Sequence, residues 1–215
     1  MRLCYNLTKM LIRSNTSRCG CSPIGPTLRP TFGPPPVHLL LGDAAPTRNR
    51  HMPRRPLDTT RGVLEIDWPL FGELCRALAL KVARDYDPEL VLGIAKAGVI
   101  PGAVIASIME REFASMAVTR SSTGGMPVLV SGPPTSIRGR RVLLVDETCD
   151  TGHTLKLALN EVRAIAPAEV RTAVSFRTGG FLPDFHSFQT DKAIVLPWDR
   201  EVIRDGVLMR RSDDA

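Results

Sequence analysis

The feature that most constrains the fold is a short stretch in which an apolar strand leads directly into two acids, a turn and a helix. The apolar run Val142–Val145 is followed by Asp146 and Glu147, and then by a turn rich in threonine and glycine. From Leu155 to Val162 the apolar residues recur at helical spacing. A buried strand that passes through a short turn into a helix is typical of a parallel sheet with helices on its faces.

The same stretch brings two kinds of chemistry close together. The free backbone N–H groups from Cys149 to Thr154, together with the threonine hydroxyls nearby, suit a phosphate group. The carboxylates of Asp146 and Glu147 suit sugar hydroxyls or a hydrated Mg²⁺ ion. A phosphorylated sugar with a metal ion would satisfy both requirements. The alternative is an ordinary strand-to-helix turn in which both acids are simply solvated.

The rest of the sequence alternates strands and helices. The predicted helices are Pro69–Arg84, Pro101–Glu110 and the segment after the acids that ends near Ile165. The predicted strands are Gly62–Trp68, Leu90–Ile94, Phe113–Thr119, Val142–Val145, Val170–Phe176 and Ala193–Leu196. The Ser/Gly/Pro-rich stretch Ser121–Pro134 is predicted to be a mobile loop with a weak strand signal at Pro127–Val130. This alternation predicts an α/β protein with a doubly wound, mostly parallel sheet, whose ligands collect at the carboxyl ends of the strands.

The positive charge of the chain is concentrated near its N-terminus. The net charge is +6 and the pI about 9.4, but residues 1–51 hold seven Lys/Arg and one acid, so the remainder is neutral overall. This distribution argues against a nucleic-acid partner. Residues 1–62 also contain nine of the eighteen prolines. We therefore expect 57–210 to form the domain and residues 1–56 to be either a segment upstream of a true start at Met52, which we prefer, or a disordered Pro/Arg-rich tail. A transit peptide is the alternative.

Two further features bear on location. The chain has no run of about 18 apolar residues, so we expect no membrane span. The five cysteines lack the spacing of a disulfide framework or a zinc site, which favours a reducing compartment, and we expect the cytoplasm.

Four segments resemble the type I phosphoribosyltransferases, and most closely their xanthine/guanine (6-oxopurine) members. Leu143–Thr154, with the sequence LLVDETCDTGHT, is similar to the signature that binds phosphoribosyl pyrophosphate (PRPP) in this family. Gly93–Ser107 is similar to the family's pyrophosphate loop and helix, and Glu65–Ala79 to its leading strand and helix. Ala193–Glu201 is similar to its closing segment, part of a small hood over the base. The resemblance covers about residues 62–205 and implies the family's fold, with a hood built from N- and C-terminal segments.

The resemblance also implies an activity and roles for individual residues. It implies transfer of ribose 5-phosphate from PRPP to a nucleobase nitrogen in purine salvage, with Mg²⁺ as cofactor and a homo-oligomer (dimer or tetramer) as the assembly. Asp146 and Glu147 would hold the ribose hydroxyls and the metal, and Asp150 would be the general base. The 5′-phosphate would be held by Thr148, Cys149, Asp150, Thr151, Gly152, His153 and Thr154. Pyrophosphate would be held by Lys96, Ala97 and Gly98, beside a cis peptide bond at Ala95–Lys96.

Two of these assignments have simpler alternatives. Lys96 could be an ordinary solvated loop lysine. Asp150 could serve only as an N-terminal acid of the following helix, a position that favours aspartate in any protein.

The acceptor side departs from the family pattern. The resemblance places the base among Ile194, Asp199 and Arg177, but Ala193 stands where an aromatic residue is expected under the base. The lysine that reads the 6-oxo group has no clear counterpart, and Arg177 is the only cation near that position. Three functions therefore stay open: transfer to xanthine, guanine or hypoxanthine, transfer to a non-purine acceptor, and PRPP or nucleotide sensing without turnover.

Overall fold

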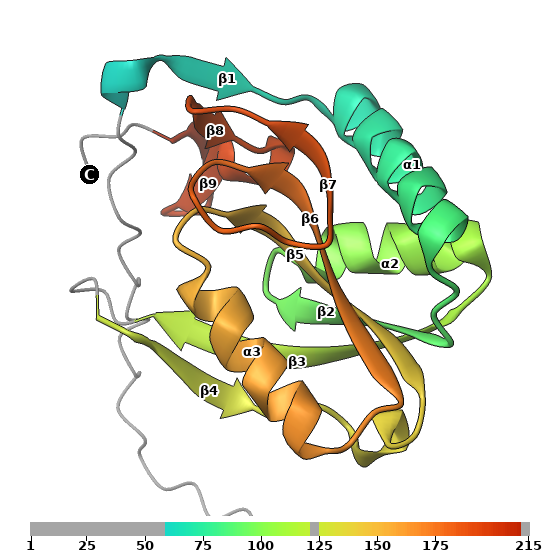
Figure 1. Cartoon of the computed structure of the whole chain (residues 1–215). Coiled ribbons are helices and arrows are strands. Elements are labelled where there is room, and N and C mark those ends of the chain that lie inside the picture. Colours follow the sequence, from blue (N-terminus) through green and yellow to red (C-terminus); the bar gives the residue numbers. More distant parts are fainter. Residues whose placement is uncertain (1–58, 121–124, 212–215) are drawn as a thin grey trace, which may run out of the picture. The chain divides into compact units, whose positions relative to one another are not determined.

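A six-stranded sheet with helices on both faces forms the centre of the protein (Figure 1). The computed structural model describes residues 59–120 and 125–211, and the expected tail at residues 1–56 lies outside them. The strand order is β4-β3-β2-β5-β6-β7. All neighbours pair in parallel except β3 and β4, which are antiparallel. The α/β class and the mostly parallel sheet are therefore as predicted.

The elements follow one another along the chain with short connections. The helices are α1 (Trp68–Asp85), α2 (Val99–Met109) and α3 (His153–Ala164), with 3-10 turns η1 (Thr59–Arg61), η2 (Thr135–Ile137) and η3 (Pro197–Asp199). The strands are β1 (Val63–Glu65), β2 (Leu90–Ala95), β3 (Glu112–Arg120), β4 (Pro127–Ser131), β5 (Arg141–Cys149), β6 (Glu169–Arg177), β7 (Phe185–Gln189), β8 (Ala193–Val195), β9 (Glu201–Arg204) and β10 (Val207–Arg210).

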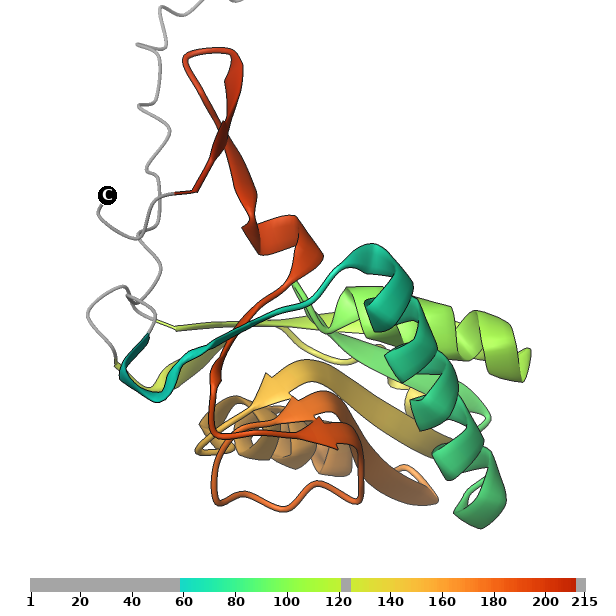
Figure 2. The same ribbon diagram turned by 90° about the horizontal axis from the view of Figure 1, so that it is seen from above.

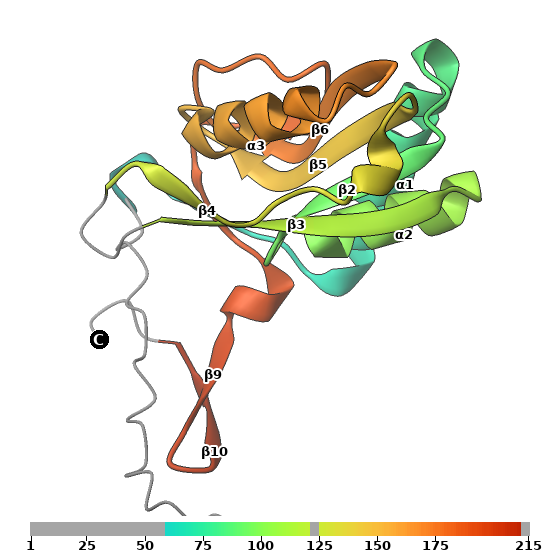
Figure 3. The ribbon, with the colours of Figure 1, turned by 90° about the horizontal axis from the view of Figure 1, so that it is seen from below.

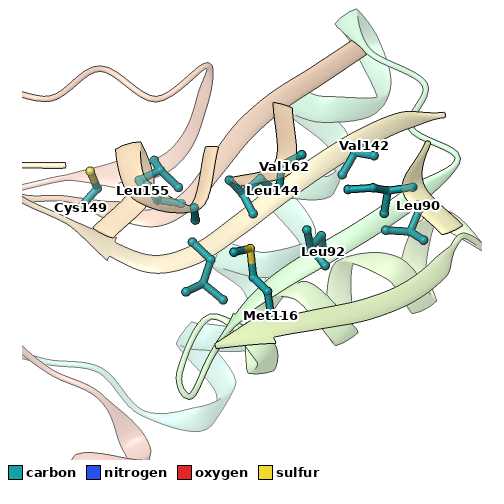
Figure 4. Packing of buried hydrophobic residues seen from close by; sticks show 12 residues of the cluster. Leu90, Leu92, Met116, Val142, Leu144, Cys149, Leu155 and Val162 are labelled. Atoms are coloured by element: carbon teal, nitrogen blue, oxygen red, sulfur yellow. The ribbon is translucent and has the colours of Figure 1, made fainter. Parts of the chain in front are cut away.

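Two apolar layers hold the helices against the sheet. On one face, α3 packs its buried side chains against alternate residues of β2, β3 and β5, among them Leu92, Met116 and Leu144 (Figure 4). On the other face, α1 and α2 pack against the intervening residues, such as Val91 and Leu143. Figure 3 shows α3 on one side of the sheet and α2 on the other. Because both faces are covered, β2 and the Val142–Val145 part of β5 are continuously apolar, as expected for central parallel strands.

Local sequence signals explain where α1 begins. The Asp67 side chain accepts a hydrogen bond of 2.9 Å from the backbone N–H of Leu70, which satisfies one of the free donors at the helix start. Pro69 lies in the first turn, where its missing N–H costs nothing. None of the helices among residues 59–120 and 125–211 has the length and apolar character needed to span a bilayer.

The strand order reverses between β2 and β5, and this point determines where a ligand can bind. The chain leaves β2 through α2 to reach β3 on one side, and leaves β5 through α3 to reach β6 on the other. Because α2 and α3 cover opposite faces, the loops after β2 and β5 lead to opposite faces of the sheet, and in open α/β sheets ligands bind at the carboxyl ends of such strands. The two most informative sequence motifs follow these two strands.

The hood is built from short pieces at both ends of the domain. β1 pairs in parallel with β8, from Val63 opposite Ala193 to Glu65 opposite Val195. An apolar cluster that includes Ile66, Phe71 of α1 and Phe176 of β6 fixes this pair to the rest of the domain. The ring centroids of Trp198 in η3 and Phe71 are 5.0 Å apart, and the two rings are in an edge-to-face arrangement. Figure 2 shows the β9–β10 hairpin extending from η3.

Several elements differ from the sequence-based expectations. β5 continues to Cys149, four residues beyond the predicted end, because it pairs with β6 as far as Arg177. Within the predicted loop Ser121–Pro134, Pro127–Ser131 is strand β4, which pairs with β3; residues 121–124 lie outside the described part. β7 and the β9–β10 hairpin were not predicted.

Candidate active site

The acidic pair lies at the end of β5, beside the point where the sheet reverses. Asp146 is buried, with 7% of its surface exposed, whereas Glu147 is half-buried. The backbone N–H of Glu147 donates to Oδ1 of Asp146 over 3.0 Å. Burial, together with the neighbouring Glu147 carboxylate, raises the pKa of Asp146 well above its usual range. Burial therefore makes the charged carboxylate of Asp146 less favourable, and a cation beside it would favour the carboxylate.

The loop after β2 lies directly against this acidic strand end. A side chain on Gly98 would place its first carbon 2.8 Å from Cα of Asp146, 2.8 Å from the carbonyl oxygen of Val145 and 2.7 Å from that of Ile94. Only glycine permits this approach, since such distances are well inside van der Waals contact. The exposed side chain of Lys96 lies in the same loop, and the Ala95–Lys96 peptide bond is cis, as the family resemblance implied. The predicted pyrophosphate loop therefore packs directly against the strand end that carries the predicted ribose site.

The turn between β5 and α3 forms a second binding surface. Gly152 precedes the helix with φ of +75°, a left-handed conformation that glycine adopts without steric cost. The Phe181 ring lies so close to Gly152 that any side chain there would collide with it. α3 then begins at His153, with its first N–H groups at the carboxyl edge of the sheet. This end of the helix can bind an anion through free donors and the helix dipole.

The residues assigned to the 5′-phosphate fall into two groups. Thr148 and Cys149 belong to β5, and the Cys149 side chain is packed in the core under α3, with 3% exposed. Burial raises the pKa of Cys149 to about 11, so its thiol is not a reactive nucleophile. Asp150, Thr151 and His153 are exposed, and Thr154 is half-buried. Thr148 is also half-buried and Gly152 is buried, so Cys149 is the residue of this set whose side chain is withdrawn into the core.

Asp150 packs against the connection between β6 and β7. Its carboxylate and carbonyl lie where a side chain on Gly179 would be, so these two residues are in close contact. The backbone N–H of Thr178 donates to the carbonyl of Cys149 over 2.9 Å, and that of Phe181 donates to the carbonyl of Asp150 over 3.4 Å. These contacts fix the backbone of the turn while the Asp150 side chain stays exposed.

Arg177 ends β6 next to this turn. It stands opposite Cys149 of β5 on one side and Gln189 of β7 on the other. Its Nε donates to the carbonyl of Phe181 over 2.9 Å, and Nη1 donates to Oε1 of Gln189 over 3.1 Å. Nη2 has no hydrogen-bond partner in the described part of the chain and could donate to a ligand. The guanidinium is thus held in place at the carboxyl edge of the sheet.

The hood residues predicted to contact a base are half-buried. Ile194 in β8 packs in the cluster that contains Phe176, the neighbour of Arg177. Asp199 lies in η3, and Ala193 begins β8, where its N–H donates to the carbonyl of Gly62 over 3.0 Å. Phe176 therefore links the hood to the strand that carries Arg177.

One cation at the site was not found from the sequence. Arg120, the last residue of β3, donates from Nε and Nη2 to Oγ1 of Thr154 over 2.9 and 2.7 Å. Its charge also acts to lower the pKa values of Asp146 and Cys149. A usable signal was the alternation along β3, in which Ala114, Met116 and Val118 face α3 and Arg120 continues the same face.

The side chains present fit a metal that arrives with its substrate. Among residues 59–120 and 125–211, no three or more His, Cys, Asp or Glu side chains are grouped so that they could hold a metal ion. Mg²⁺ is commonly bound by one or two carboxylates, with substrate phosphates and water completing its coordination. Asp146 and Glu147 supply that donor set, and burial raises the pKa of Asp146 in spite of the lowering effect of Arg120, so a bound cation would still favour its carboxylate form.

Comparison with known proteins agrees with this geometry. Residues 66–204 match the family model described as the phosphoribosyl transferase domain. The chain is 29% identical over 156 residues to a xanthine-guanine phosphoribosyltransferase of Nitratidesulfovibrio vulgaris, covering 67% of this chain and 90% of that protein. It is 30% identical over 91 residues to an orotate phosphoribosyltransferase of Methanocorpusculum labreanum, covering 42% of this chain and 52% of that protein. The crystal structure of a purine phosphoribosyltransferase from Pyrococcus horikoshii superposes with a TM-score of 0.58 and 27% identity, covering 66% of this chain and 98% of that chain.

Proposed function

The chain belongs to the phosphoribosyltransferase family, and we propose that it transfers the phosphoribosyl group of PRPP to a ring nitrogen of a 6-oxopurine with release of pyrophosphate. The observation that carries this proposal is the contact between the two motifs. Gly98 lies against the backbone of Asp146, so the loop after β2 and the acidic end of β5 form one continuous surface. PRPP has pyrophosphate on one side of its ribose and a 5′-phosphate on the other, and it would span this surface from Lys96 to Thr154.

The proposed reaction needs positioning and charge more than a nucleophilic side chain. The bond between C1′ of the ribose and the pyrophosphate oxygen breaks, while a bond forms from C1′ to the base nitrogen. Positive charge develops on the ribose ring, and the carboxylates of Asp146 and Glu147 would stabilise it while orienting the ribose hydroxyls. The exposed Asp150 carboxylate would accept the proton that the base nitrogen loses. Lys96 would stabilise the departing pyrophosphate.

A magnesium ion would add one element to this chemistry. When bound, Mg²⁺ would neutralise part of the pyrophosphate charge, and Asp146 and Glu147 are the residues that would hold it. The buried position of Asp146 fits that role, because a carboxylate without a partner is costly to bury.

A purine acceptor is supported from two directions. Two of the similar proteins carry names that refer to purine bases, xanthine-guanine and purine phosphoribosyltransferase. In addition, Arg177 is held at the carboxyl edge of the sheet, where Nη2 could donate to the 6-oxo group of a purine. We expect the enzyme to act in purine salvage, in the cytoplasm and as a homo-oligomer.

A base panel tests this function. The full chain with PRPP and Mg²⁺ would be supplied in turn with guanine, xanthine, hypoxanthine, adenine and orotate, and pyrophosphate release would be followed. The proposal predicts release with at least one 6-oxopurine and formation of the matching nucleoside 5′-monophosphate. Pyrophosphate release with orotate alone would contradict the proposal. So would the absence of release with every base of the panel, if PRPP itself binds to the chain.

A non-purine acceptor is the second candidate because of Ala193. This residue carries a methyl group at the start of β8, where the family resemblance places an aromatic ring under the base. Stacking of a base on an aromatic side chain contributes about 1–3 kcal/mol, so its absence removes one reason for a large flat acceptor. The orotate arm of the panel addresses this candidate directly.

A further inference from the structure

We propose that Arg120 binds the 5′-phosphate of the substrate together with Thr154. This inference rests on the proposed function, because it assigns a residue to the site at the start of α3. It adds a cation from β3, a strand that none of the motifs found in the sequence includes.

The backbone of β3 directs Arg120 toward α3. Side chains alternate along a strand, and Ala114, Met116 and Val118 all belong to or pack against the core cluster beneath α3. Arg120 is the next residue on that face and the last of the strand. It therefore emerges beyond the core, level with the first turn of α3.

Two hydrogen bonds fix the guanidinium in that place. Nε and Nη2 both donate to Oγ1 of Thr154, over 2.9 and 2.7 Å. Thr154 is in the first turn of α3, next to His153. Because its oxygen accepts from Arg120, the hydroxyl proton of Thr154 is free to donate to a ligand. The remaining N–H groups of Arg120 have no partner in the described part of the chain and could also donate.

A bound anion would complement the charge of Arg120 at the start of α3. The N-terminus of a helix carries partial positive charge, so a cation there is unfavourable. Arg120 forms no ion pair with any described residue, although the chain pairs several other arginines with carboxylates, such as Arg140 with Glu112. A phosphate between Arg120 and the N–H groups of α3 would compensate both charges. Arginine is well suited to this contact, since its planar fork can bind two phosphate oxygens.

Binding of substrate fragments separates this proposal from the proposed function. Ribose 5-phosphate, ribose and pyrophosphate with Mg²⁺ would each be titrated calorimetrically into the full chain. The variants are Arg120→Gln, Arg120→Lys and, as a matched control, Arg138→Gln. Arg138 is also an exposed arginine, but it precedes β5 and so lies near the amino-terminal ends of the parallel strands. The control removes the same charge without touching the site.

The expected result is a selective loss. Arg120→Gln should weaken ribose 5-phosphate binding about 10- to 100-fold, the range for a lost charge-assisted hydrogen bond, and leave pyrophosphate binding unchanged. Arg120→Lys should bind ribose 5-phosphate with an affinity between those of the unmodified chain and Arg120→Gln, because lysine keeps the charge but lacks the planar guanidinium. Thermal unfolding should be unaltered, since the side chain is exposed.

Three outcomes would overturn the assignment. Arg120→Gln could bind ribose 5-phosphate as the Arg138→Gln control does, or it could lose pyrophosphate instead, which would place Arg120 at the other end of PRPP. If the unmodified chain bound neither ribose 5-phosphate nor pyrophosphate, the proposed function itself would fail, and the role of Arg120 with it.

Discussion

The proposed PRPP side of the site and its proposed acceptor side are built by different kinds of contact. On the PRPP side, the loop after β2 and the end of β5 touch through backbone atoms, with Gly98 against Asp146. On the acceptor side, the hood consists of strands of three or four residues held to the domain by side chains such as Trp198. Its hairpin leaves Ile203 70% exposed and Leu208 61% exposed.

This difference suggests how one fold can serve several acceptors. A surface made from backbone in a packed sheet cannot change without disturbing the core, so it suits the substrate that all family members share. A surface made from side chains on short strands can change by single substitutions, as at Ala193. The PRPP side should therefore be intolerant of small changes, and the acceptor side permissive.

The largest effect is expected on the PRPP side, at the proton acceptor. Asp150→Asn should lower kcat by about 10²–10⁴-fold, the usual contribution of a general base, and leave PRPP affinity nearly unchanged. The amide can still occupy the space beside Gly179 but cannot take a proton. Turnover with guanine and calorimetric titration of PRPP would check this. If kcat changes by less than a factor of a few, Asp150 is only an N-terminal acid of α3.

The contact between Gly98 and the Asp146 backbone can be disrupted by adding one methyl group. Gly98→Ala would bring a carbon to within 2.8 Å of the Asp146 backbone, so the loop and strand must separate. A displacement of about 1 Å can reduce kcat/KM for PRPP about 100-fold. Gly72→Ala in α1 is the control, because nothing lies within 4 Å of its added carbon. Equal kinetics for both variants would show that this contact is not needed.

On the acceptor side, adding a ring should improve the site. Ala193→Trp should strengthen purine binding by about 1–3 kcal/mol if the base lies where the family resemblance places it. The KM values for guanine, xanthine and hypoxanthine would be compared in both forms. A rise in all three KM values, with unchanged KM for PRPP, would mean that the indole blocks the acceptor site and that the base is bound differently.

The smallest effect concerns the free protein and its pH dependence. Because the folded state raises the pKa of Asp146, this group stabilises the fold below its unfolded pKa, and the stabilisation is lost as pH rises through the folded value. Asp146→Asn should therefore remove part of the stability loss that occurs as pH rises above the unfolded pKa of an aspartate. Urea unfolding at several pH values, without ligand, measures this.

The exposed Asp87 provides a comparison of opposite sign. A hydrogen bond from Arg111 lowers the pKa of Asp87, so its contribution is present above the unfolded pKa and is lost as pH falls. If the Asp146→Asn and Asp87→Asn variants changed the pH profile in the same direction, the interpretation of Asp146 would be wrong.

Much of the central sheet could be predicted from the sequence because its signals are local. The apolar runs of β2 and β5, the helical spacing of α1 and α3, and the acids after Val145 can be seen without knowledge of their neighbours. The motifs after β2 and β5 were placed at the carboxyl edge of the sheet, and the structure brings Gly98 and Asp146 into contact there. The ligand-binding roles of these residues stay predictions.

The remaining features depend on contacts between distant segments. β7 reads FHSFQ, which has no clear alternation, and it becomes a strand because it pairs with β6 at the sheet edge. β5 extends to Cys149 for the same reason. Arg120 and Thr154 are 34 residues apart, so only the packing of α3 over β3 brings them together. Arg177 was noted in the sequence, but its restraint by Gln189 was not.

The claim that the chain itself forms the PRPP site before any base binds can be tested directly by PRPP titration. PRPP with Mg²⁺ would be titrated calorimetrically into the full chain without a base, and into the Asp146→Asn/Glu147→Gln double variant. Our account predicts saturable binding to the unmodified chain and severe weakening in the double variant, with far-UV circular dichroism unchanged. Equal PRPP affinity in both proteins, or binding only once a base is present, would contradict it.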